Sequence, residues 1–240
     1  MARKIGTLAE SSLHAQLKKL YLRAGDEVEV DVDGYVADIR HGHQLIEIQT
    51  SNFSGFKRKL AHLLRHYPVH VVYPVAETKR VLRVAHGEME WRNGHARKGR
   101  VIDIFDELVS IPDLVMDPNL TFEVARVEEE EVLKFERQYG RGRGGWSVVD
   151  RRLIELRGRV LLASLADFQA LLPDGLAEPF TTSQLAKALP SAKDLAGKMA
   201  YVLRRIGAIE RVGKRRNSLL FAKPRNPELS QMDTEFDENE

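Results

Sequence analysis

Two acidic side chains are spaced so that neighbouring strands would bring them face to face. Asp38 and Glu47 lie in two segments that alternate polar and apolar residues and are separated by the turn HGHQ. If the turn centres between Gly42 and His43, Asp38 stands directly opposite Glu47. Like charges at that position repel each other and destabilise a sheet. A divalent cation between the carboxylates would remove the repulsion, so the pair is a candidate metal site.

The segments around this pair predict a small α/β unit. Residues 5–22 and 50–67 each carry an apolar stripe at helical spacing. Residues 26–33 alternate valine with acid, as expected for a half-exposed strand. Residues 69–75 are nearly all apolar, which suits a central strand covered on both faces. A leading helix, three strands, a helix and a further strand would therefore surround the two carboxylates.

This arrangement resembles the core of the PD-(D/E)XK nucleases over residues 5–75. The resemblance rests on Asp38, eight intervening residues, then Glu47-Ile48-Gln49 and a following helix. It implies a restriction-endonuclease-like mixed sheet flanked by helices, and a metal-dependent phosphodiesterase. It also implies that Asp38, Glu47 and the carbonyl of Ile48 hold Mg²⁺ or Mn²⁺, with Glu10 of the first helix nearby. Gln49 stands where the family usually has lysine; a minority carries Gln or Glu there, and some members move the lysine to the helix.

The remaining candidates each have a second interpretation. Glu10 and His14 fall on the apolar stripe of the first helix. A carboxylate on a buried face needs a partner, which would direct Glu10 to the metal. Alternatively, Glu10 is an acid in the first helical turn, where the helix dipole favours it. His14 is either a core histidine or a phosphate contact. In the mechanism that the resemblance implies, Gln49 would orient the water that attacks the phosphate. Lys57, at the edge of the apolar arc, could extend its stem toward the metal or remain a surface lysine; Lys59 is expected to point away from the sheet.

The second half of the chain has a different pattern. We expect a nuclease-like domain at 1–136, a Gly/Arg-containing linker or connector at 137–160, a mainly helical domain at 161–225 and an acidic, disordered tail at 226–240. Residues 161–225 are expected to form two helices, a longer helix and a two-stranded ribbon. This order resembles a winged helix-turn-helix domain. That resemblance implies a nucleic-acid-binding module.

Charge supports nucleic acid as the partner. Residues 181–225 contain eleven Lys and Arg against two acids, and such a surplus attracts polyanions. The expected contacts lie on or before the longer helix and at the ribbon tip: Lys193, Lys198, Tyr201, Arg204, Arg205, Lys214, Arg215 and Arg216. The alternative is that these charges are merely solvated and that the domain contacts protein.

Composition excludes several classes of protein. The chain has no cysteine, which excludes disulfides and thiolate metal sites. No apolar run approaches the ~20 residues of a membrane span, and the N-terminal residues lack a signal core; we expect a cytoplasmic protein, with a homodimer left open. The predicted function is a Mg²⁺- or Mn²⁺-dependent nuclease, with DNA favoured as substrate. The alternative is a catalytically inactive nuclease-fold regulator or adaptor that binds DNA.

Overall fold

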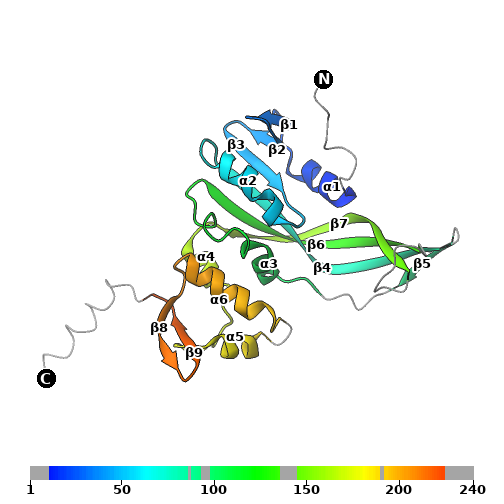
Figure 1. Ribbon diagram of the computed structural model, residues 1–240. Coiled ribbons are helices and arrows are strands. Elements are labelled where there is room, and N and C mark those ends of the chain that lie inside the picture. The colour runs from blue at the N-terminus through cyan, green and yellow to red at the C-terminus, as the bar shows by residue number, and fades with distance from the viewer. Residues whose placement is uncertain (1–10, 86–87, 93–97, 136–144, 190–191, 225–240) are drawn as a thin grey trace, which may run out of the picture.

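A large mixed sheet runs through the molecule (Figure 1). The computed structural model describes residues 11–85, 88–92, 98–135, 145–189 and 192–224. In chain order the elements are α1 (Ser12–Tyr21), β1 (Glu27–Val32), β2 (Tyr35–His41), β3 (Gln44–Ile48), α2 (Phe53–Leu63), β4 (Val69–Ala85), β5 (Glu88–Arg92), the 3-10 helix η1 (Val101–Ile104), α3 (Phe105–Leu108), β6 (Leu120–Phe135), β7 (Trp146–Leu162), α4 (Leu165–Gln169), α5 (Thr182–Ala188), α6 (Leu195–Arg205), β8 (Glu210–Arg215) and β9 (Ser218–Ala222). Within these residues no helix is long and apolar enough to cross a membrane.

The sheet has the strand order β1-β2-β3-β4-β6-β7, and β5 pairs with β4. β1, β2 and β3 form an antiparallel meander, whereas β4 is parallel to β3. A parallel neighbour requires a crossover connection, which α2 supplies. His41 pairs with Gln44, so the turn between β2 and β3 consists of Gly42 and His43 as predicted. Gly42 has a φ of 57°, in the left-handed region that favours glycine. The predicted mixed sheet flanked by helices is confirmed.

The two faces of the sheet are covered by different helices. On one face, Leu13 and Leu17 of α1 pack against Ile39, Ile46 and Ile48. On the other face, the buried side of α2 packs with α3 and with the C-terminal helices in one continuous apolar cluster. Each face of the sheet thus has its own apolar cluster.

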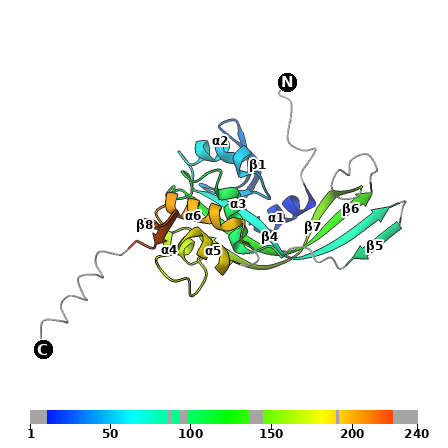
Figure 2. The same ribbon diagram turned by 60° about the horizontal axis from the view of Figure 1, so that its bottom comes forward.

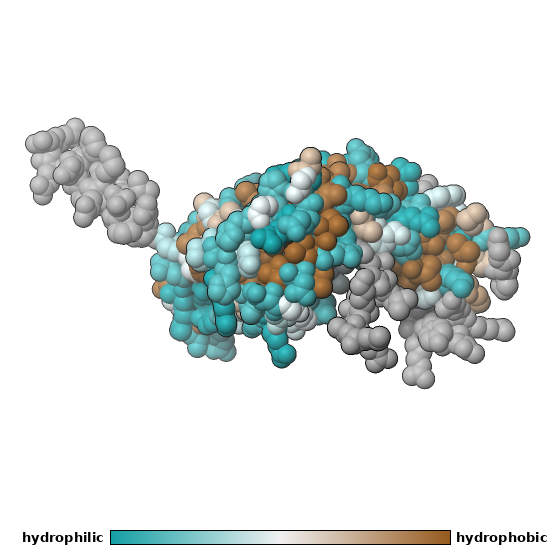
Figure 3. Space-filling model, turned by 90° about the horizontal axis from the view of Figure 1, so that it is seen from above, coloured by the Kyte–Doolittle hydropathy of each residue, from teal (hydrophilic) through white to brown (hydrophobic). Residues whose placement is uncertain are grey.

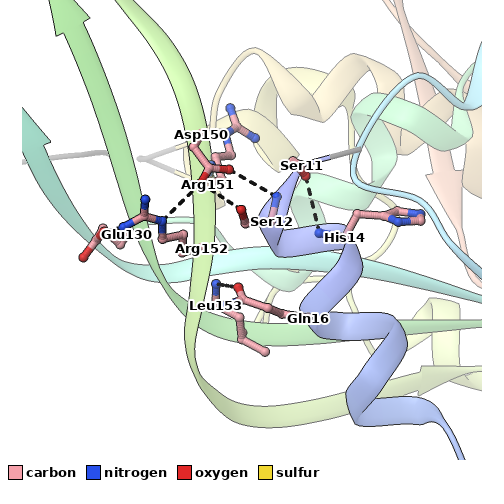
Figure 4. A network of polar contacts seen from close by, with 9 residues as sticks. All are labelled: Ser11, Ser12, His14, Gln16, Glu130, Asp150, Arg151, Arg152 and Leu153. Carbon is pink, nitrogen blue, oxygen red and sulfur yellow. Dashed lines mark hydrogen bonds and ion pairs between the residues drawn. The ribbon is translucent and has the colours of Figure 1, made fainter. Parts of the chain in front are cut away.

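Polar contacts fix α1 on the sheet (Figure 4). Ser12 donates to Asp150 of β7 through its backbone N–H (3.1 Å) and its hydroxyl (2.8 Å). The backbone N–H of Leu153 donates to the side chain of Gln16 at 2.7 Å. Ser11 caps the helix by accepting from the N–H of His14. The contacts with Asp150 and Leu153 join residues more than a hundred positions apart and set the orientation of α1.

The strand β7 occupies most of the expected linker. Residues 146–160, predicted as part of a connector over 137–160, pair with β6 along its whole length. The prediction of a linker there was wrong, because β7 satisfies its backbone hydrogen bonds on β6 although much of its surface stays exposed. The Gly/Arg residues 136–144 and the acidic residues 225–240 lie outside the described residues.

Long strands carry the sheet beyond the helices. β4, β6 and β7 have 17, 16 and 17 residues, and with β5 they project as an arm in both ribbon views (Figures 1 and 2). The arm strands bear exposed apolar side chains, among them Met89, Trp91 and Val149. The view from above also shows hydrophobic residues gathered toward this end (Figure 3).

The acidic run of β6 is not a solvated face. Glu128, Glu129 and Glu131 are buried. Lys79 lies 2.8 Å from both Glu129 and Glu131, and Arg80 lies 2.6 Å from Glu128. Cations on the neighbouring strands thus neutralise acids that the sheet withdraws from water.

The C-terminal residues form three short helices and a two-stranded ribbon, gathered at the end of the molecule opposite the arm (Figure 2). Ser164 and Thr181 cap α4 and α5, each within a capping box. Gly207, with a φ of 79°, follows α6. Phe180 joins the ribbon through a bridge to Phe221. This unit shares the apolar cluster of the α2 face, so it is packed onto the sheet unit.

Candidate functional site

Asp38 and Glu47 lie at the point where β3 leaves β2. The antiparallel pairing of β2 and β3 covers only residues 39–41 and 44–46. Beyond Ile46, β3 pairs with β4 alone, with Glu47 beside Val71. Asp38 and Glu47 are the next residues of the two strands, and they lie at the opening where β2 and β3 are no longer paired.

Asp38 bridges this opening. The backbone N–H of Ile48 donates to Oδ2 of Asp38 at 2.8 Å, in place of a strand-to-strand bond. Nε2 of His14, from α1, lies 3.3 Å from the same oxygen. Burial opposes ionisation of Asp38, but the hydrogen bond and charge of His14 and the N–H of Ile48 outweigh it and lower the pKa of Asp38. Asp38 is therefore held as a carboxylate.

Glu47 is fully buried and is paired with a lysine of α2. Nζ of Lys59 donates to Oε2 of Glu47 and to the carbonyl of Val36, both at 2.6 Å. Oε1 of Glu47 is buried and has no hydrogen-bond partner among the described residues. Burial raises the pKa of Glu47 to about 7, opposed by Lys59 and reinforced by the charge of Asp38. The site thus contains a desolvated acceptor oxygen close to a second carboxylate.

The two helices reach the carboxylates from opposite faces of the sheet. His14 comes from α1, whose apolar residues pack with Ile46 and Ile48, and Lys59 comes from α2 in the other apolar cluster. The opening between β2 and β3 admits both side chains. The candidate site is therefore His14, Asp38, Glu47 and Lys59, a set that combines an acid pair with cationic or proton-carrying groups.

The structure places Lys59, and not the predicted Lys57, beside Glu47. Lys57 is exposed, whereas Lys59 forms the ion pair with Glu47 and was expected to point away from the sheet. Both residues flank the apolar arc of α2, one on each edge, because each residue turns the helix by 100°. The sequence does not specify which edge faces Glu47, since that depends on the crossover from β3 to β4. Helical period alone makes Lys57 and Lys59 equivalent candidates, one at each edge of the arc.

The other predicted site residues have mixed outcomes. Gln49 follows β3 directly, is partly buried and donates its backbone N–H to Val72 at 2.9 Å. Glu10 lies outside the described residues. Within the described part of the chain, no group of three or more His, Asp and Glu side chains is arranged to hold a metal. Of the ligands that the resemblance implies, Asp38, Glu47 and Ile48 lie within the described residues.

The predicted nucleic-acid contacts of α6 are partly engaged elsewhere. Lys198 lies 2.9 Å from Asp106 of α3, and Arg205 contacts Asp113. Both ion pairs are half exposed, so each contributes little to stability. Both predicted contact residues thus lie against acids of the sheet unit. Exposed side chains remain at Lys193, Tyr201, Arg204, Lys214, Arg215 and Arg216.

Comparison with known proteins places the chain in a family. A family model described as "Domain of unknown function (DUF8091)" matches residues 11–163, and the chain belongs to this family. The match runs from the start of α1 to the end of β7, so it contains the whole candidate site. A protein of Treponema pallidum (strain Nichols) named "Uncharacterized protein" is 29% identical over 187 residues, which cover 76% of this chain and 74% of that protein. No solved structure matches.

The ion pair between Glu47 and Lys59 gives a prediction about stability. We expect Lys59→Met to lower the free energy of unfolding by about 3 kcal/mol, because it leaves a buried carboxylate without its cation. Lys57→Met removes the same charge from an exposed position of the same helix and should change stability by less than about 0.5 kcal/mol. Urea denaturation measures both.

The matched control is the double variant Lys59→Met/Glu47→Gln. It removes both charges together, so it should recover a large part of the stability that Lys59→Met loses. A Lys59→Met protein as stable as the parent would show that the pair does not stabilise the fold.

Proposed function

We propose that the chain is a metal-dependent phosphodiesterase that acts on nucleic acid, with DNA as the favoured substrate. The observation that carries the proposal is the meeting of Asp38, Glu47 and Lys59 where β2 and β3 separate. An acid pair with an adjacent ammonium is the set that phosphodiester hydrolysis requires: oxygen ligands for a hard cation and a positive charge for the developing negative charge.

The topology supports the same proposal. The order α1-β1-β2-β3-α2-β4, with an antiparallel meander and a parallel β4 reached through α2, is the arrangement expected of a PD-(D/E)XK core. Asp38 lies on the second strand and Glu47 on the third, as in the PD-(D/E)XK pattern. The position of Lys59 on α2 agrees with a lysine moved from the third strand to the helix.

The donor set fits a hard divalent cation. Carboxylate and carbonyl oxygens are the ligands that Mg²⁺ prefers, and Oε1 of Glu47 is a buried oxygen with no hydrogen-bond partner among the described residues. Asp38, Glu47 and the carbonyl of Ile48 would hold the ion, with Glu10 a further candidate. When bound, the ion would polarise the scissile phosphate and lower the pKa of the attacking water.

The side chains around the carboxylates have separate roles in this proposal. The ammonium of Lys59 would stabilise the negative charge that gathers on the phosphate oxygens. Gln49, next to Ile48, would orient the attacking water by hydrogen bonding. His14 holds Asp38 as a carboxylate from the α1 side.

We further propose that the C-terminal unit is a winged helix-turn-helix module that binds the substrate. Its three helices followed by the β8–β9 ribbon have the expected order. Lys214, Arg215 and Arg216 are exposed at the end of β8 and in the turn that follows it. Since Lys198 and Arg205 are engaged with acids, the ribbon carries more of the binding than α6.

A non-catalytic nucleic-acid-binding protein is the second candidate. It is favoured by the contacts that already engage the acid pair: Oδ2 of Asp38 with Ile48 and His14, and Oε2 of Glu47 with Lys59. In that case the four side chains stabilise the opening between β2 and β3 and hold no metal.

Asp38→Asn separates the two candidates. The amide oxygen still accepts from the N–H of Ile48, so the fold should persist, while the charged ligand is removed. We expect Mn²⁺-dependent cleavage to fall by at least about 100-fold. The assay incubates supercoiled DNA, single strands and RNA with and without Mn²⁺, and a thermal melt checks folding. Lys57→Ala is the control that should cleave as the parent does.

Two results of this assay would contradict the catalytic proposal. One is equal cleavage by Asp38→Asn and the parent, which would mean that the site is misassigned. The other is the absence of cleavage of every substrate by the parent while binding is retained, which would favour the second candidate.

The ribbon proposal predicts a change in salt dependence. Replacing Lys214, Arg215 and Arg216 with glutamine should weaken DNA binding and reduce the slope of log K against log salt by about 0.9 for each phosphate that the protein no longer neutralises. A filter or anisotropy titration at several salt concentrations measures this. The control replaces Lys57, Arg58 and Arg65 on and just after α2; an equal decrease of slope in both triple variants would rule out the ribbon as the principal binding surface.

A further inference from the structure

A polar cavity lies at the C-terminal end of α1, separate from the acid pair. It has a volume of about 340 Å³ and is lined by Leu20, Tyr21, Arg23, Gln44, Ile46, His70, Glu123 and Arg159. These residues come from α1, the residues just after it, and the four strands β3, β4, β6 and β7. The volume lies within the range of small-molecule sites, which begins at about 300 Å³.

Glu123 is the centre of a hydrogen-bonded cluster in this cavity. Its Oε1 accepts from the hydroxyl of Tyr21 and lies 3.3 Å from Nε of Arg159. Its Oε2 lies 3.3 Å from Nε2 of His70. Nδ1 of His70 lies 2.9 Å from the hydroxyl of Thr121. Four elements thus converge on one carboxylate and fix the groups around it.

The cluster leaves the cavity suited to an anion. Both oxygens of Glu123 already have partners in Tyr21, Arg159 and His70, and Glu123 is the single acid among the described lining residues. Burial opposes ionisation of Glu123, but the hydrogen bonds from His70 and Tyr21 outweigh it and lower its pKa. Two arginines, Arg23 and Arg159, line the cavity together with this single acid. Arg23 is exposed, and its charge also acts on Asp26, whose carboxylate accepts from the backbone N–H of Arg23 at 2.8 Å.

The shape of the lining indicates what kind of anion fits. Arg159 directs Nε to Glu123 and stacks over the ring of Tyr21 at 5.0 Å, which fixes the plane of its guanidinium. A fixed guanidinium matches phosphate oxygens in a two-pronged contact. The side chain of Gln44 adds a neutral donor. Leu20 and Ile46 form an apolar wall beside the charges, which an organic group attached to the phosphate would contact.

We propose that this cavity binds a phosphate monoester. Arg23 and Arg159 contact the phosphate, whereas Tyr21, His70 and Glu123 are positioning residues that hold Arg159 in place. The phosphate belongs either to a small phosphorylated metabolite such as a mononucleotide or to the end of a nucleic-acid strand. Neither source requires catalysis at Asp38 and Glu47, so this site stands independently of the proposed function.

Calorimetric titration of the full chain at low salt tests the proposal. The probes are inorganic phosphate, adenosine 5′-monophosphate, adenosine, and a short oligonucleotide with either a 5′-phosphate or a 5′-hydroxyl. We expect the phosphorylated probes to bind more tightly than adenosine and the 5′-hydroxyl strand. Arg23→Gln and Arg159→Gln should each weaken that binding by about tenfold or more, because each removes a charge-assisted hydrogen bond.

Arg65→Gln is the matched control, because it removes one exposed arginine from the end of α2 on the opposite face of the sheet. It should bind the probes as the parent does. Arg23 is exposed, so Arg23→Gln keeps the test decisive if Arg159→Gln fails to fold. Tight binding of the mononucleotide alone, or of the 5′-phosphorylated strand alone, supports the site and identifies the source. Equal affinity for phosphorylated and unphosphorylated probes, or an equal decrease of affinity in Arg65→Gln, overturns the proposal.

Discussion

The separation of β3 from β2 is the constraint on which the rest of the structure depends. β3 pairs with both β2 and β4 at Leu45 and Ile46, and with β4 alone at Glu47 and Ile48. The N–H of Ile48 then has no strand partner on the β2 side, and Asp38 accepts its hydrogen bond. Glu47, turned toward α2 and buried, requires the ammonium of Lys59. The separation of β2 and β3 thus brings Asp38 and Glu47 together and leaves polar groups that His14 and Lys59 must pair with.

The candidate site and the cavity both depend on α1. His14, near the start of α1, contacts Asp38, and Tyr21, at its end, contacts Glu123. The helix is held over the sheet by Asp150 and by the backbone of Leu153 on β7. The family match begins at α1 and ends with β7, and so includes the strand that anchors the helix. The C-terminal unit lies beyond this range and packs on the opposite face.

The sequence predicts what depends on short-range order. The turn at Gly42, the register of β2 with β3, and the helix over residues 53–63 all follow from alternation, turn chemistry and helical period. It does not predict contacts that depend on crossover geometry, such as the choice of Lys59 over Lys57. It also missed β7, because exposed alternating arginines resemble a linker until β6 is known to lie beside them. The cavity residues come from five separate parts of the chain, so no local pattern groups His70, Glu123 and Arg159.

Binding of Mn²⁺ to the acid pair tests the central claim most directly. Calorimetry on the parent, Asp38→Asn and Glu47→Gln measures the ion without any assumption about substrate or cleavage. The account predicts that the parent binds Mn²⁺ and that each variant, still folded by its thermal melt, loses that binding, since each lacks a charged oxygen ligand. Absence of Mn²⁺ binding by the parent, or equal binding by the parent and both variants, would contradict it.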